Sequence, residues 1–533
     1  MGFESLGRMF GFERLHLALA TLVGLVVSVV IGLYAVGYGG NPIKSLMLLV
    51  GCGLLLLSTI SPRTGLKFLL ISGAYLDFFK RFLLFFGIGS FSDVLGVLAV
   101  APINLTGVFL GACVLRPIFT KQVPDRQERR LIFLALFLIT ASLASSIRSS
   151  GGITPAVIGN AANQSAYALL VPTICILYRR RDTEELRRLL QFAVLAYLPV
   201  AIYGVHQSIF GYSQFEIDYL RSGLSSLADI MYDAHPRPFS TLNSNHAFAV
   251  SMGILVLISS LLCFPNLRPR GEILLSKWRW ILPVVFVVAC LISFGRGGWM
   301  VSIIGFICIF AFRTRTRLVT FYTVFALSFG LLLWRADDIY NSLDKLQEML
   351  PSGSSFREQA FRLGTYSERL YGFQNIFKNR AMWTWFGNPN LDYKAGERLD
   401  ADEIVHDALG QMLISHGIVG ILVIAALGSF SLFTLHRRIL AIQRGPKEIL
   451  ARGMLGVGIA VAFGGLFTGS HLSVFPINLL FWTAVGVLVA AAQLENPTKE
   501  ANVTTGKPTS LSRGSQRPER RAALGATGFR PST

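Results

Sequence analysis

The sequence predicts an all-α, polytopic helical membrane protein with about 12–14 transmembrane helices, each of about 20 apolar residues. Of its 533 residues, 52% are hydrophobic and only 15% are charged, against roughly 25% charged residues in a soluble domain. The basic residues concentrate in short loops between apolar runs, which is typical of cytoplasmic loops. This distribution accounts for the net charge of +19, so we expect contact with membrane lipids and no nucleic-acid partner.

The apolar runs can be placed along the chain. They lie near residues 15–37, 42–60, 65–88, 97–115, 131–147, 155–178, 188–210, 244–264, 278–294, 299–312, 318–334, 408–435, 452–470 and 474–493. With the N-terminus in the cytoplasm, nearly every basic loop falls inside and the C-terminus returns inside. Asp77, Lys80 and Arg81 fall within the third run. They either end a short helix or are intramembrane charges with a function, and both interpretations stay open.

Polar segments at 211–243, 293–298 and 335–405 fall outside in this topology. The last is long, more acidic than basic and helically periodic, so we expect a large helical periplasmic loop with a function. The chain then divides into transmembrane helices with an outer loop near 211–243 (1–334), the large loop (335–405), C-terminal transmembrane helices (406–494) and a disordered basic cytoplasmic tail (495–533).

The stretch EIVHDALGQMLISHGIVGIL at 403–422 places His406 at the start of an apolar run. On one continuous helix, Gly410, Gly417 and Gly420 lie within about 40° of His406. Small residues let a neighbouring helix approach closely, so this face is expected to look into the bundle, with His406 at its outer rim. The alternative is a histidine that only caps the helix or lies among headgroups.

The stretch LISFGRGGWM at 291–300 must contain a turn, because 278–312 is too long for one span of a bilayer about 30 Å thick. The turn places Arg296 at the outer face, at the depth of His406. Its flanking glycines are expected to leave the guanidinium accessible and the backbone free to approach a ligand. A guanidinium suits phosphate oxygens; the alternative is an arginine that snorkels to the headgroups.

The stretch AHPRPFSTLNSNHAF at 234–248 leads from the first outer loop into a span. Its side chains suit sugar hydroxyls and phosphate, so we predict that Arg237, Asn243 and Asn245 bind substrate. Arg369 in the long loop is a further anion-binding candidate. No residue is predicted to bind a metal.

Together these stretches resemble the O-antigen ligase and O-antigen polymerase superfamily of bacterial membrane glycosyltransferases. Its ligases carry His, then Asn, Ser or Gln, then nine residues and Gly-x-x-Gly; His406, Asp407 and Gly417-Ile-Val-Gly420 fit this spacing, with Asp407 as a departure. The surroundings of Arg296 resemble the family's outer arginine element in a looser form. RPFSTLNSNHAF resembles the polymerase-type start of a span, and the resemblance covers roughly 190–435.

The resemblance implies transfer of a glycan from undecaprenyl diphosphate to an acceptor hydroxyl at the periplasmic face of the inner membrane, without a metal or other cofactor. The acceptor is another glycan for a polymerase that joins repeat units into O-antigen or exopolysaccharide, and lipid A core for a ligase. A flippase and a chain-length regulator are implied partner proteins. Arg296, with Arg237 or Arg369, stabilises the diphosphate leaving group, and neutral His406 accepts the proton in an inverting displacement.

Two choices stay open at the level of function. The RPFSTLNSNH segment and Asp407 favour a polymerase over a ligase. A transporter or flippase of lipid-linked glycans is the alternative class, and it predicts internal repeats and charges near the midplane. The chain has no convincing repeat, and its charges outside the third run lie at the rims of the spans.

Overall fold

The computed structural model describes most of the apolar part of the chain. The described residues are 42–86, 100–120, 124–150, 165–178, 183–221, 231–232, 235–264, 280–311, 383–387, 408–429, 445–468 and 474–493, with isolated positions between them. The predicted span 15–37, most of 318–334, most of the loop 335–405 and the tail 495–533 lie outside these residues.

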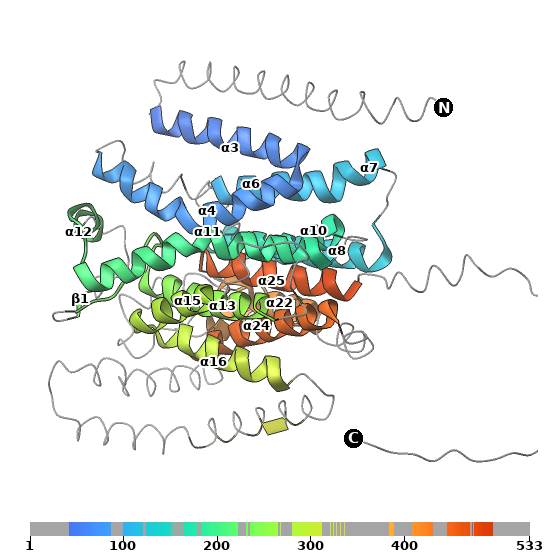
Figure 1. Ribbon diagram of the computed structural model, residues 1–533. Helices are drawn as coiled ribbons and strands as arrows, with labels where there is room; N and C mark the ends of the chain where they lie inside the picture. Colours follow the sequence, from blue (N-terminus) through green and yellow to red (C-terminus); the bar gives the residue numbers. More distant parts are fainter. Residues whose placement is uncertain are drawn as a thin grey trace, which may run out of the picture. The chain divides into compact units, whose positions relative to one another are not determined.

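The described residues are helical apart from connecting turns and one pair of two-residue strands (Figure 1). The helices are α3 (Pro42–Ile60), α4 (Pro62–Phe85), α6 (Val100–Phe109), the π-helix η1 (Leu110–Leu115), α7 (Arg116–Thr120), α8 (Arg126–Ser150), the 3-10 helix η2 (Ala166–Leu169), α10 (Leu170–Tyr178), α11 (Thr183–Phe210), α12 (Gln214–Arg221), α13 (Asn245–Leu262), α15 (Ile281–Ile292), α16 (Arg296–Ala311), α22 (Ala408–Ser429), α24 (Pro446–Thr468) and α25 (Ile477–Gln493). Strands β1 (Met231–Tyr232) and β2 (His235–Pro236) pair antiparallel, with Met231 opposite Pro236. Each predicted span except 15–37 and 318–334 coincides with a described helix.

Five of the described helices are long and apolar enough to cross a membrane. They are Val100–Ile118, Arg126–Ile147, Thr183–Phe210, Asn245–Leu262 and Pro446–Gly465. Shorter apolar helices accompany them. The chain is therefore an all-α, multi-pass membrane protein, as the sequence predicts.

Side chains at helix starts satisfy backbone N–H groups that have no partner within the helix. Asp125 accepts the N–H groups of Gln127 and Glu128 at 2.8 Å, and Glu128 accepts the Asp125 N–H at 2.8 Å. This reciprocal pair is a capping box at the start of α8. Ser244 caps α13 by accepting the N–H of Ala247 at 3.0 Å, so local contacts define where both helices begin.

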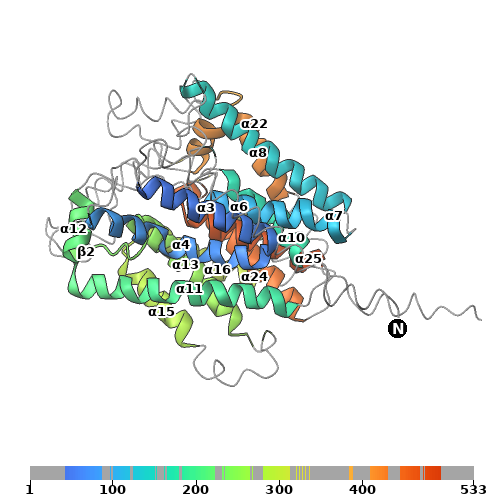
Figure 2. The same cartoon turned by 90° about the horizontal axis from the view of Figure 1, so that it is seen from above.

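Helix α13 is the most enclosed of the candidate spans. It contacts α11, α15, α16, α24 and α25 and lies among them in both views (Figures 1 and 2). A helix that is apolar all round, as α13 is, buries every face. The packing of α13 therefore fixes the position of its first residues, which belong to the predicted site stretch 234–248.

Helices α4 and α11 pack together and run in the same direction. Near their starts, Arg63 of α4 pairs with Glu185 of α11 at 3.0 Å. Further along, the Tyr75 hydroxyl donates to the Ala196 carbonyl at 2.9 Å. The contacts advance in step along both helices, which agrees with the predicted topology, where the third and seventh spans run the same way.

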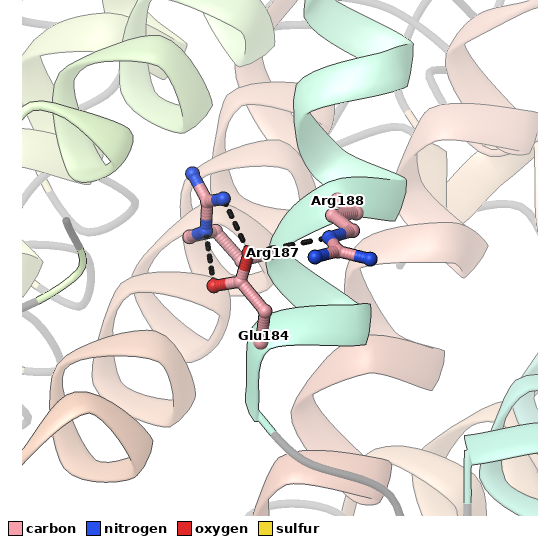
Figure 3. A network of polar contacts seen from close by, with 3 residues as sticks. All are labelled: Glu184, Arg187 and Arg188. Atoms are coloured by element: carbon pink, nitrogen blue, oxygen red, sulfur yellow. Dashed lines mark hydrogen bonds and ion pairs between the residues drawn. The ribbon is translucent and has the colours of Figure 1, made fainter. Parts of the chain in front are cut away.

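The start of α11 carries an ion-pair network (Figure 3). Glu184 accepts from Arg187 Nε at 2.8 Å and Nη2 at 2.6 Å, and from Arg188 Nε at 3.2 Å. Arg187 is buried and its contact is bidentate, the stronger geometry. The Arg188 side chain is 68% exposed, and such a pair contributes less than about 1 kcal/mol.

Candidate functional site

The segment 237–244 follows an irregular path between β2 and α13, and α11 and α12 hold it there. Gln207 Oε1 of α11 accepts the N–H groups of Phe239 at 3.1 Å and Ser240 at 2.6 Å. Gln207 Nε2 donates to the carboxylate of Glu216 in α12, which is itself buried. The Gln207 amide therefore has a defined orientation, and it fixes the backbone of the segment.

Arg81, near the end of α4, holds the same segment from another side. Its side chain is fully buried, and it donates to the carbonyl of Ser240 at 2.6 Å and to the carbonyl of Leu242. Its guanidinium lies over the Phe239 ring, 4.4 Å from the centroid. Carbonyl oxygens and an aromatic face both stabilise a buried cation, so Arg81 is a positioning residue for this segment.

Asp77 lies about one turn before Arg81 and Lys80 directly precedes it, and both are also buried. They form an ion pair of 3.0 Å, and Lys80 Nζ lies 5.5 Å from the centroid of the Tyr219 ring. Because α4 continues to Phe85, these charges lie inside a helix and do not end it. Asp77 and Lys80 are partners within one helix turn, whereas Tyr219 beside Lys80 and Ser240 beside Arg81 come from distant parts of the chain and could not be predicted from the sequence.

Asn245, the first residue of α13, joins two predicted site segments. Its Nδ2 donates to the Pro238 carbonyl at 2.9 Å and to the Ser293 carbonyl at 2.8 Å. Pro238 follows Arg237, and Ser293 begins the turn before Arg296, so the two arginine-bearing segments meet at one amide. Both amide hydrogens of Asn245 are used in these contacts, and only its Oδ1 is left to contact a ligand.

The turn predicted between two spans is present. Helix α15 ends at Ile292 and α16 begins at Arg296. The Ser293 hydroxyl donates to the Cys290 carbonyl at 2.6 Å and accepts the Gly295 N–H at 3.1 Å. These contacts close the turn and place half-buried Arg296 at the start of α16.

Two of the glycines beside Arg296 face α13 and not a ligand. A Cβ on Gly295 would lie 2.2 Å from Ala249 Cβ, and a Cβ on Gly298 would lie 2.1 Å from the Ala249 carbonyl oxygen. The expectation that these glycines free the backbone for a ligand is therefore wrong for Gly295 and Gly298. They are small because α13 and α16 approach closely here.

Backbone strain falls on the same two segments. Among the described residues, Ser240 (φ 55°) and Phe294 (φ 51°) are the non-glycine residues with a left-handed backbone. Each such residue costs on the order of 1–3 kcal/mol and persists only where its surroundings hold it; these conformations cluster at functional sites. Arg81 and Gln207 hold Ser240, so the strain supports a functional role for this region.

Arg237 and Asn243 lie half-buried in the segment. The Tyr212 hydroxyl donates to the Arg237 carbonyl at 2.5 Å. Burial, and then the negative charge of Glu216, raise the pKa of Tyr212, so its hydroxyl keeps its proton. The Asn243 Oδ1 is a buried acceptor with no hydrogen-bond partner in the described part of the chain. Such groups are rare in native proteins, and a donor from a ligand would satisfy this one.

His406 and Arg369, together with Asp407, lie outside the described residues, so their roles stay predictions. The helix that follows His406 is described, and it is broken at Gly417, where φ is 67° and ψ is −166°. The prediction of one continuous helix face from His406 through Gly417 and Gly420 is therefore wrong.

The segment 383–387 of the long loop occupies the break in α22. The Thr384 carbonyl accepts the N–H of Ile418 at 2.9 Å, and the Trp385 carbonyl accepts the N–H of Val419 at 3.1 Å. A Cβ on Gly417 would lie 2.3 Å from the Gly387 nitrogen. Only glycine fits a left-handed position with so close a neighbour, so Gly417 forms a junction between loop and helix. No local pattern could predict this contact.

Two of the predicted site residues, Arg237 and Arg296, are cations. Arg237 and Arg296 suit anionic oxygens such as those of a phosphate. Within the described ranges, no group of three or more His, Cys, Asp and Glu residues could hold a metal ion. The expectation that the reaction needs no metal stays a prediction.

The fold and the site define a class: a multi-pass helical membrane protein whose arginine-bearing segments meet at the ends of its helices. Residues 281–425 match the family model described as O-antigen ligase. Over these residues the match supports the predicted resemblance to the O-antigen ligase and polymerase superfamily, whose members act in polysaccharide biosynthesis. The matched region contains Arg296, the segment 383–387, His406 and the break at Gly417. No curated protein and no solved structure matches the chain significantly.

Proposed function

We propose that this protein transfers a glycan from undecaprenyl diphosphate to an acceptor hydroxyl at the periplasmic face of the bacterial inner membrane. The observation that carries the proposal is the link that Asn245 makes between the Arg237 segment and the Arg296 turn. It joins the segment that carries Arg237 to the turn that precedes Arg296, and in this proposal the two guanidinium groups bind the diphosphate of the membrane lipid. The family match supports the same reaction type.

In this reaction the acceptor oxygen forms a bond to the anomeric carbon as the bond from that carbon to the diphosphate oxygen breaks. The electron pair leaves with the diphosphate, and Arg296 stabilises its added negative charge together with Arg237 or Arg369. The acceptor proton passes to neutral His406. Direct displacement inverts the anomeric configuration, and no metal or other cofactor takes part.

Within this function we favour polymerisation of O-antigen or exopolysaccharide over ligation to lipid A core. The RPFSTLNSNHAF stretch at 237–248 and the acidic residue Asp407 support this choice. Both termini then lie in the cytoplasm. A flippase that delivers the lipid-linked glycan and a chain-length regulator are the partner proteins of this proposal.

Transport of lipid-linked glycans is the other class of function considered. Buried charges inside a span would favour it, and Asp77, Lys80 and Arg81 are such charges. Asp77 pairs with Lys80, and Arg81 donates to backbone carbonyls. These charges therefore have partners within the protein, and Arg81 stabilises the site segment.

Complementation tests the proposal. Arg296→Ala and His406→Ala are expressed in a strain that lacks this protein, with membrane levels measured by immunoblot and surface polysaccharide resolved by gel. Both variants are expected to insert normally and to lose long-chain glycan. Arg188→Ala is the matched control, because this exposed arginine lies at the start of α11, far along the helix from the Gln207 contact, and should leave the glycan unchanged.

The products distinguish the two acceptors. Single repeat units on lipid A core indicate a polymerase, whereas long undecaprenyl-linked chains with a bare core indicate a ligase. Normal polysaccharide in both variants would overturn the site assignment and favour transport.

A further inference from the structure

Glu216 of α12 is a buried carboxylate that accepts hydrogen bonds from α11 and from the start of its own helix. The residue is 1% exposed. One of its oxygens accepts from the Tyr203 hydroxyl at 2.8 Å and from Gln207 Nε2, both in α11. The other accepts the N–H and the hydroxyl of Ser213, each at 2.8 Å. These four donors are all neutral.

Other side chains of α12 pack this helix against α4. The Phe215 ring meets the rings of Phe78 and Phe85 edge-on, with 5.8 Å and 6.2 Å between the ring centroids. Tyr219, one turn further along, is buried as well. An apolar residue in place of Glu216 would extend this packing without the cost of taking a carboxylate out of water. The packing of α12 therefore does not explain the buried carboxylate.

The carboxylate determines how the Gln207 amide is oriented. A carboxylate only accepts hydrogen bonds, so the amide turns its Nε2 toward Glu216 and its Oε1 away from it. Oε1 accepts the N–H groups of Phe239 at 3.1 Å and Ser240 at 2.6 Å. A reversed amide would place its own N–H groups against these donors. Through Gln207, Glu216 thus holds the left-handed backbone of Ser240.

A second connection runs from Glu216 to Arg237. Glu216 holds both the backbone and the side chain of Ser213. Tyr212 directly precedes Ser213, and its hydroxyl donates to the Arg237 carbonyl at 2.5 Å. One carboxylate therefore acts on the segment at two points, the Arg237 carbonyl and the Ser240 N–H.

We propose that Glu216 is a positioning residue for glycan transfer: through Gln207 and Tyr212 it fixes the backbone that carries Arg237. This role deepens the proposed function and rests on it. A reacting or stabilising group displaced by about 1 Å can lower a rate by about 100-fold. Since negative charge builds up on the diphosphate in the transition state, a displaced guanidinium lowers kcat more than it raises KM.

The test exchanges the carboxylate and the amide. Glu216→Gln offers one oxygen and one NH2 group where the four donors need two oxygens, and Gln207→Glu places two carboxylates against each other. In the double variant Gln207→Glu/Glu216→Gln, the contacts can form again. The carboxylate at 207 accepts from the segment and from the amide at 216, and the oxygen of that amide accepts from Ser213.

Transfer is measured in proteoliposomes, with lipid-linked glycan extracted from a strain that lacks this protein, at a temperature below the melting temperature of each variant. Each single variant is expected to lower kcat about tenfold or more. Its apparent KM should stay within about threefold of the wild-type value. The double variant should recover kcat to within about threefold of wild type, as expected for two residues in direct contact.

Asp218→Asn is the matched control, because this carboxylate of α12 is exposed and accepts from Gln214 at 3.0 Å. Its kcat should equal that of the wild type. A kcat within about twofold of wild type for folded Glu216→Gln would overturn the proposal, since a residue that only stabilises the fold leaves folded protein active. A double variant that does not fold, or that transfers no faster than the single variants, would overturn it too. The double variant decides the question if the single variants do not fold.

Failure of this role is distinguishable from failure of the proposed function. If the wild type transfers glycan and Arg296→Ala does not, the function stands whatever the Glu216 variants do. If the wild type itself transfers none, the proposed function fails, and the role of Glu216 in transfer fails with it.

Discussion

Replacing Arg81 tests whether a buried cation positions the site. In Arg81→Ala, the carbonyls of Ser240 and Leu242 lose their charged donors, and the Phe239 ring loses the guanidinium above it. Among the described contacts, Ser240 then keeps those to Gln207 and Val200 of α11. We expect both the free energy of unfolding and the rate of transfer to fall.

The magnitude follows from the contacts. A hydrogen bond to a charged group contributes about 1.5–3 kcal/mol, and Arg81 makes two such bonds to backbone carbonyls. We therefore expect Arg81→Ala, which removes both bonds, to lower the free energy of unfolding by about 3–6 kcal/mol. Arg81→Lys keeps the charge but not the planar guanidinium, so its free energy of unfolding should lie between those of the wild type and Arg81→Ala.

Titration of purified protein in mixed micelles with a denaturing detergent measures the change in stability, and transfer in proteoliposomes measures activity. Arg188→Ala is the control and should cost less than about 1 kcal/mol. If Arg81→Ala costs no more than Arg188→Ala and keeps full transfer, Arg81 does not hold the segment and the reasoning is wrong.

Three other substitutions, the last with Gly53→Ala as its control, have equally definite outcomes. Asn245→Leu leaves the Pro238 and Ser293 carbonyls without their donor. It should lower the free energy of unfolding by about 2–4 kcal/mol and remove most of the transfer activity; unchanged transfer would contradict the role of Asn245 as the link. Gly417→Ala puts a Cβ 2.3 Å from a backbone nitrogen at a left-handed position and should cost more than about 2 kcal/mol; normal melting would refute the described break. Gly298→Ala meets the Ala249 carbonyl oxygen at 2.1 Å, whereas Gly53 has open space around it. Thermal melting should therefore fall for Gly298→Ala and stay equal or rise slightly for Gly53→Ala.

The membrane spans could be predicted because the length and apolarity of a helix are local properties of the sequence. The same holds for the turn before Arg296, which follows from a run too long for one bilayer crossing. The polar stretch at 234–248 was visible as a candidate site because it gathers donors and acceptors at the start of a span.

The contacts that hold the site could not be predicted in this way. Arg81 was visible as a charge in an apolar run, but the Ser240 carbonyl that it contacts lies 159 residues away. Nothing in the sequence around Gln207 distinguishes it from other polar residues near a helix end. Gly417 satisfied a helical pattern, and only the insertion of the segment 383–387 shows why the helix breaks there. These features depend on tertiary contacts, which hydrophobic periodicity does not encode.

The fate of the lipid carrier tests the central claim most directly. Purified protein in proteoliposomes is given lipid-linked glycan, and free undecaprenyl diphosphate and extended or transferred glycan are measured together. The account predicts that both products form in equal amounts with wild-type protein and that neither forms with Arg296→Ala. Lipid-linked glycan that crosses the bilayer intact, with no diphosphate released, would contradict the account and identify a transporter.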